Sequence, residues 1–79
     1  MEHQNQEEEL RAHLLSTDQR FRELSEQHAR LKREIEAIES RAHVTEADEL
    51  EEQRLKKLKL AIKDQMKEIM AQHRHAAVQ

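Results

Sequence analysis

The feature that most constrains this chain is a stripe of large apolar residues that recurs at helical spacing in two stretches. The stripe consists of Phe21, Leu24, Leu31, Ile35 and Ile38, followed after a polar break by Leu55, Leu58, Ile62, Met66 and Ile69. Steps of three, four or seven residues place side chains on one face of an α-helix. The sequence therefore predicts two long amphipathic helices joined by a turn.

The starts of these helices are predicted from side chains that can accept hydrogen bonds from the free N–H groups of a first turn. Two residue pairs have capping-box spacing: Ser16 with Gln19, and Thr45 with Asp48. They predict helices over about 17–40 and 46–73. Within residues 1–15, Leu10, Leu14 and Leu15 favour either a flexible segment or a short helix that must dock or fray.

The expected fold class is all-α, an antiparallel two-helix hairpin that resembles a coiled coil. The hairpin spans 16–73, and a frayed tail is expected over 74–79. A connection of about five residues forces consecutive helices to lie antiparallel. The expected hairpin seam contains the ten apolar residues above together with His28, which stands near Ile62 in the expected register. A shift by one turn stays open, because a heptad stripe matches itself after such a shift.

The seam supplies little core for this chain. Only 35% of the residues are hydrophobic and one is aromatic, whereas 39% are charged. That composition is poor for a compact fold, so the remaining leucines need a partner. Either the short N-terminal helix folds back onto the hairpin, or these leucines face another chain. Self-association into a four-helix arrangement is favoured, with a marginal monomer as the alternative, and the candidate partner surface is Leu14, Leu15, Leu50 and Leu60.

The pattern resembles that of the YdcH-like family, small bacterial proteins grouped as a domain of unknown function. The residues that carry the resemblance are Ser16, Asp18, Phe21, Leu24, Leu31, Glu34, Ile35, Ile38, Glu39, Leu55, Leu60, Ile62, Lys63, Asp64 and Met66. It covers roughly residues 10–72 and is strongest from Lys59 to Met66. The resemblance implies a helical hairpin and no established activity.

His28 is the one polar residue in the seam of the first predicted helix. One interpretation is a pH-sensitive determinant of register, since imidazole titrates near neutral pH. The favoured interpretation is a ring that packs at the seam edge while a nitrogen reaches water or a neighbouring side chain. The six histidines include no pair at i, i+4 spacing, and there is no cysteine. We expect no metal site and no cofactor.

Four lysines of the second predicted helix step by three and four residues: Lys56, Lys59, Lys63 and Lys67. Such a stripe is able to track phosphates, which makes weak nucleic-acid binding the alternative function. Aromatic residues for base stacking are absent from this stripe, and the acidic run from Glu46 to Glu52 lies just upstream. A solvated flank whose aliphatic stems cover the seam is therefore favoured.

The sequence indicates an interaction protein and not an enzyme. No catalytic constellation is present, and pairs such as Glu26 with Arg30 have the spacing of surface helix support. We expect no small-molecule substrate. The acidic start of the chain and the lack of long apolar windows favour a cytoplasmic location with no membrane contact. The leading hypothesis is helix-mediated protein interaction, through a homodimer or another helical protein.

Overall fold

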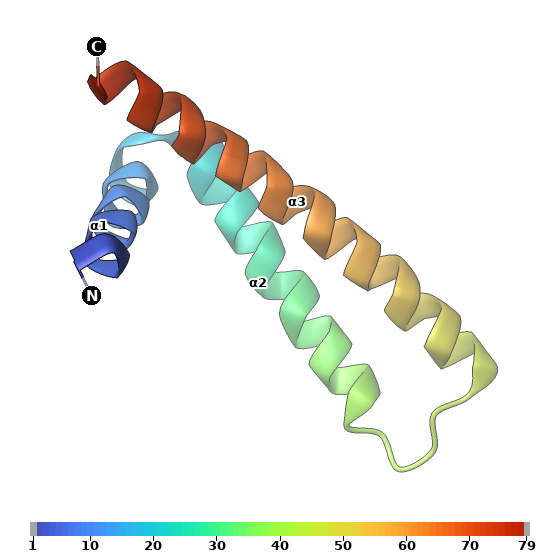
Figure 1. Ribbon diagram of the computed structural model, residues 1–79. Coiled ribbons are helices and arrows are strands. Elements are labelled where there is room, and N and C mark those ends of the chain that lie inside the picture. The colour runs from blue at the N-terminus through green and yellow to red at the C-terminus, as the bar shows by residue number, and fades with distance from the viewer. Residues whose placement is uncertain (1, 79) are drawn as a thin grey trace.

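The computed structural model describes the backbone of residues 2–78 and the side chains of residues 6–74. Over that range the chain forms three α-helices and no strand: α1 Glu2–Thr17, α2 Gln19–Glu39 and α3 Glu46–Val78. Helices α2 and α3 form an antiparallel hairpin, and α1 lies across the open end of the hairpin, beside the C-terminal part of α3 (Figure 1). The predicted all-α hairpin is confirmed.

The two outer helices are longer than predicted. Helix α1 runs through Thr17, and α3 continues to Val78 instead of ending near residue 73. Residue 1 and residue 79, which the predictions included, lie outside the described range. Helix α1 packs beside this part of α3, where the rings of His13 and His73 meet edge to face with centroids 5.8 Å apart. The backbone of the tail predicted to fray is helical through Val78.

The first helix start was predicted wrongly, and the second is confirmed. Helix α2 is capped by Asp18, whose Oδ1 accepts a hydrogen bond of 2.9 Å from the backbone N–H of Phe21. Ser16 cannot cap α2, because α1 is still helical there and the Ser16 hydroxyl donates to the carbonyl of His13 at 2.9 Å.

At α3 the expected capping box is complete. The Asp48 N–H donates to Oγ1 of Thr45, and the Thr45 N–H donates to Oδ2 of Asp48, both at 3.1 Å. The hydrogen bond that the Thr45 backbone N–H donates to the Asp48 carboxylate is the main cause that holds the pKa of Asp48 below its usual value, and the Thr45 hydroxyl and the charge of Arg41 lower it further. Arg41 also forms an ion pair with Asp48 across the loop. The loop end of α3 is thus held by its own capping residues.

The buried apolar residues form two clusters at opposite ends of the hairpin. The end cluster lies beside α1 and contains the buried residues Leu14, Phe21 and Met70, with Leu10, Leu15, Met66 and Ile69 packed against it. The loop cluster contains Ile35, Ile38 and Leu55, with Leu31 packed against it. Ile35 and Leu55 share the loop cluster, and Phe21 and Ile69 share the end cluster, so the residues expected near each other lie at the same end of the hairpin.

Between the clusters the seam is more open. Leu24 is buried and Ile62 is half-buried, but Leu58 is 42% exposed. Its expected place inside the seam is therefore corrected to the seam's edge. There it lines a shallow hollow of about 330 Å³ with Leu31 and Ile62.

The whole chain is elongated, measuring 52 × 24 × 17 Å. Its radius of gyration is 15.7 Å, against about 12 Å for a compact domain of this length. Its accessible surface is 6451 Å², against about 5,000 Å² for a compact monomer of this mass. The fold thus leaves more surface exposed than a globular domain of this size does.

Candidate functional site

The candidate sites of this protein are surfaces and hollows between helices. Within residues 6–74, no three acidic or histidine side chains gather closely enough to hold a metal ion. Over residues 2–78, no helix is both long and apolar enough to cross a membrane.

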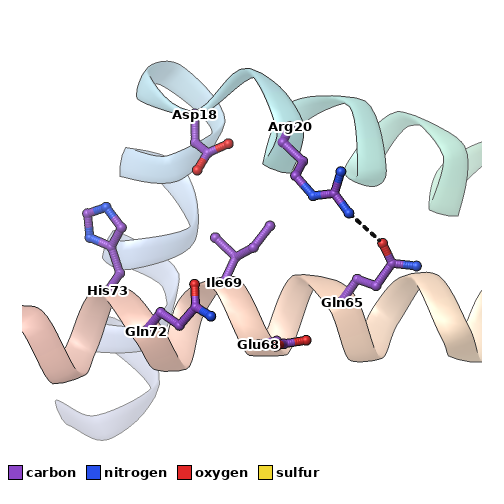
Figure 2. A pocket seen from close by; sticks show the side chains of 7 residues that line it. All are labelled: Asp18, Arg20, Gln65, Glu68, Ile69, Gln72 and His73. Carbon is purple, nitrogen blue, oxygen red and sulfur yellow. Dashed lines mark hydrogen bonds between the residues drawn. The ribbon is translucent and has the colours of Figure 1, made fainter.

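A hollow of about 420 Å³ lies where the start of α2 meets the C-terminal part of α3 (Figure 2). Nη2 of Arg20 donates to Oε1 of Gln65 at 3.1 Å and so links the two helices. Asp18 caps α2 from the rim, and His73 packs against His13 of α1. These polar groups already hold helices together, which favours a structural junction.

The candidate partner surface predicted from the sequence divides into two parts. Leu14 has no exposed surface, and Leu15 is half-buried against the same end cluster. Leu14 belongs to the core of this chain, which corrects its assignment to a partner surface, and Leu15 packs against that core because α1 folds back onto the hairpin. Met70 completes that cluster and was missed, although its position four residues after Met66 continues the helical stripe.

Leu50 and Leu60 remain on the surface, with 69% and 56% of their area exposed. They belong to a second row on α3, which we call the outer stripe: Leu50, Gln53, Lys57, Leu60 and Asp64, all exposed. Steps of three and four residues place this row on one helical face. Leu55 and Ile62 pack toward α2 from the other side of the helix, so the outer stripe faces away from the hairpin.

The four lysines of the candidate phosphate-contacting stripe have different surroundings. Nζ of Lys56 lies 3.4 Å from Oε2 of Glu39 and 3.8 Å from Oε2 of Glu52. Lys59 is half-buried, whereas Lys63 and Lys67 are exposed and line a hollow together with α1. The stripe is thus interrupted by carboxylates at its loop end, which weakens the case for phosphate tracking along its length.

His28 lies half-buried in the open middle of the seam. Burial lowers the pKa of its imidazole below the ordinary value, and the positive charges of Lys59, Lys63, Lys32 and Arg11 lower it further. A neutral ring at neutral pH agrees with the packing interpretation.

Comparison with known proteins yields one family. The model of a family described as a protein of unknown function, DUF465, matches residues 21–70, which contain nearly all of α2 and most of α3. No curated protein and no solved structure matches the chain. The match covers the hairpin and leaves α1 outside.

Proposed function

Because the chain belongs to the DUF465 family, the YdcH-like small proteins of unknown function, we propose that it is a non-catalytic interaction protein that self-associates. The proposed contact is the outer stripe of α3, and its occupant is a second copy of the same chain. The observation that carries the proposal is the exposure of Leu50 and Leu60 on that stripe.

The exposed leucines support a helix-to-helix contact because of their spacing. A single exposed leucine is ordinary on a protein surface. Leu50 and Leu60, however, stand ten residues apart, which is one heptad plus three, as at the a and d positions of a coiled coil. A second helix laid along the outer stripe would cover both, and it would bury part of the large surface that this elongated chain exposes.

The charges along α3 favour an antiparallel arrangement of the two copies. The first turn is acidic, with Glu46, Asp48 and Glu49, and the middle of the helix is basic. A parallel pair would place the two acidic first turns beside each other and the two basic middles beside each other. An antiparallel pair places Leu50 opposite Leu60 of the second copy and Glu49 opposite Lys63 of the second copy.

Sedimentation equilibrium tests this proposal. We expect the wild-type chain, of 9.5 kDa, to show a concentration-dependent dimer. Leu50→Lys and Leu60→Lys should each weaken the dimer while the far-ultraviolet circular dichroism stays that of a helical protein, because neither side chain contributes to the core. The matched control is Val44→Lys, which introduces the same charge at a 44% exposed position in the loop.

Two results would refute the proposal. One is a wild-type chain that sediments as a monomer up to about millimolar concentration, where even a weak dimer is populated. The other is a dimer whose dissociation constant is the same in Leu50→Lys, in Leu60→Lys and in the control Val44→Lys.

A further inference from the structure

A second hollow, of about 300 Å³, lies on the flank of α3 opposite the one in Figure 2. All three helices line it: Glu7 and Arg11 from α1, Ser25 and His28 from α2, and Lys63, Met66, Lys67 and Met70 from α3. Its volume is at the lower end of the range for small-molecule sites, about 300–1,000 Å³. The docking of α1 creates this hollow, because the hairpin alone lacks one of its walls.

The lining combines positive charge with an apolar floor. Three cations line it, Arg11, Lys63 and Lys67, against the single carboxylate of Glu7, which lies 3.9 Å from Nη2 of Arg11. Among the described side chains, neither lysine forms an ion pair. Met70 is buried and Met66 is half-buried. Methionine side chains adapt to the shape of an apolar group.

His28 lies among the same positive charges. The charged groups around its imidazole are Arg11 and Glu7 on α1, Lys32 on α2, and Lys59 and Lys63 on α3. The cations add to the effect of burial in lowering its pKa. An anion that enters the hollow would reverse part of that effect, since an opposite charge stabilises the imidazolium ion.

We propose that this hollow binds a small organic phosphate, a phosphate monoester on a compact apolar group. The planar guanidinium of Arg11 suits the phosphate oxygens, Lys63 and Lys67 add point charges, and the methionines accept the apolar group. The ligand is bound and not chemically changed. The hollow is formed by one chain, and in the proposed dimer its Lys63 also faces Glu49 of the second copy.

Phenyl phosphate is a suitable probe. Titrated into the full chain and followed by NMR, it should give saturable shifts of residues around the hollow and raise the pKa of His28. Arg11→Gln with Lys67→Gln should weaken binding by about tenfold or more, because two cationic contacts are lost. The control is Arg22→Gln with Arg33→Gln, which removes the same charge from exposed positions of α2 and should change binding by about twofold at most.

Several outcomes would overturn the inference. They are shifts that grow linearly without saturation, equal weakening in the two double variants, or a His28 pKa that phenyl phosphate leaves unchanged. Inorganic phosphate that binds as tightly as phenyl phosphate would remove the role of the methionine floor. A single-stranded oligonucleotide that binds while phenyl phosphate does not would assign the cations to nucleic acid instead.

Discussion

Single side chains decide where each helix begins. Asp18→Ala should lower the free energy of unfolding by about 1 kcal/mol, the usual cost of losing a cap. Ser16→Ala should change it by less than about 0.5 kcal/mol, because the Ser16 hydroxyl only returns to a carbonyl of its own helix. Urea unfolding followed by circular dichroism compares the two. If Ser16→Ala lowered the free energy of unfolding more than Asp18→Ala does, Ser16 would be the cap of α2, as predicted from the sequence.

His28 makes the stability of the hairpin depend on pH. Its pKa is lower in the folded chain than the ordinary 6.5, so below that pH the unfolded chain binds more protons. Well above pH 6.5, His28 therefore adds nothing to the pH dependence of the free energy of unfolding. As the pH falls from 6.5 to the folded pKa, His28 lowers that free energy.

The measurement is the melting temperature from about pH 8 to about pH 5. We expect His28→Gln to lose part of the decrease in stability that the wild-type chain shows on acidification. His43→Gln, in the exposed loop, should keep the full decrease. If both variants follow the wild-type curve, His28 is not the group that titrates.

At the residue scale the sequence could predict one cap and not the other. Thr45 and Asp48 satisfy each other within one turn, so local spacing was sufficient to find them. Ser16 and Asp18 are both competent caps. The choice between them depends on α1 staying helical through Thr17, which no local signal near residue 16 determines.

At the scale of elements, α1 packs onto the hairpin through its buried leucine. Leu14 is fully buried against Phe21 and Met70, so Leu14→Ala should cost about 2–5 kcal/mol of stability. Val44→Ala, at an exposed position, should cost less than about 0.5 kcal/mol. Thermal unfolding measures both. A Leu14→Ala variant as stable as the control would mean that α1 does not pack on the hairpin in solution.

The hairpin could be predicted from sequence, but the surroundings of α1 could not. The stripe on α2 and α3 sets which faces meet, and the short connection sets their direction. The leucines of the first helix did not indicate where that helix packs. They are Leu10, Leu14 and Leu15, and they would be buried equally well against the hairpin or against another chain. The hollow lined by Arg11, Lys63 and Lys67 escaped prediction for the same reason.

For the whole molecule, the end cluster and the loop cluster are small cores at the two ends of an elongated chain. The docking of α1 covers the leucines of the N-terminal helix and leaves Leu50 and Leu60 exposed on the outer face of α3. We propose that the partner of this outer face is a second copy of the chain. In an antiparallel dimer, the α3 helices of the two copies would pack against each other at the centre, and the two α1 helices would lie at opposite ends.

Charge reversal at two positions beside the outer stripe, Glu49 and Lys63, tests this dimer. Glu49→Lys makes both positions basic, and Lys63→Glu makes both acidic, so each variant alone would face like charges in an antiparallel dimer. An equal mixture would restore opposite charges at both contacts. The matched control is the mixture of Glu26→Lys with Lys32→Glu, which changes the same charges on α2.

The deciding measurement is sedimentation equilibrium of each Glu49 or Lys63 variant alone and of the two in equal amounts. We expect monomers for each variant alone and a dimer in the mixture, with the control variants dimeric both alone and mixed. A mixture that stays monomeric, or single variants that dimerise as the wild type does, would contradict an antiparallel dimer built on the outer stripe.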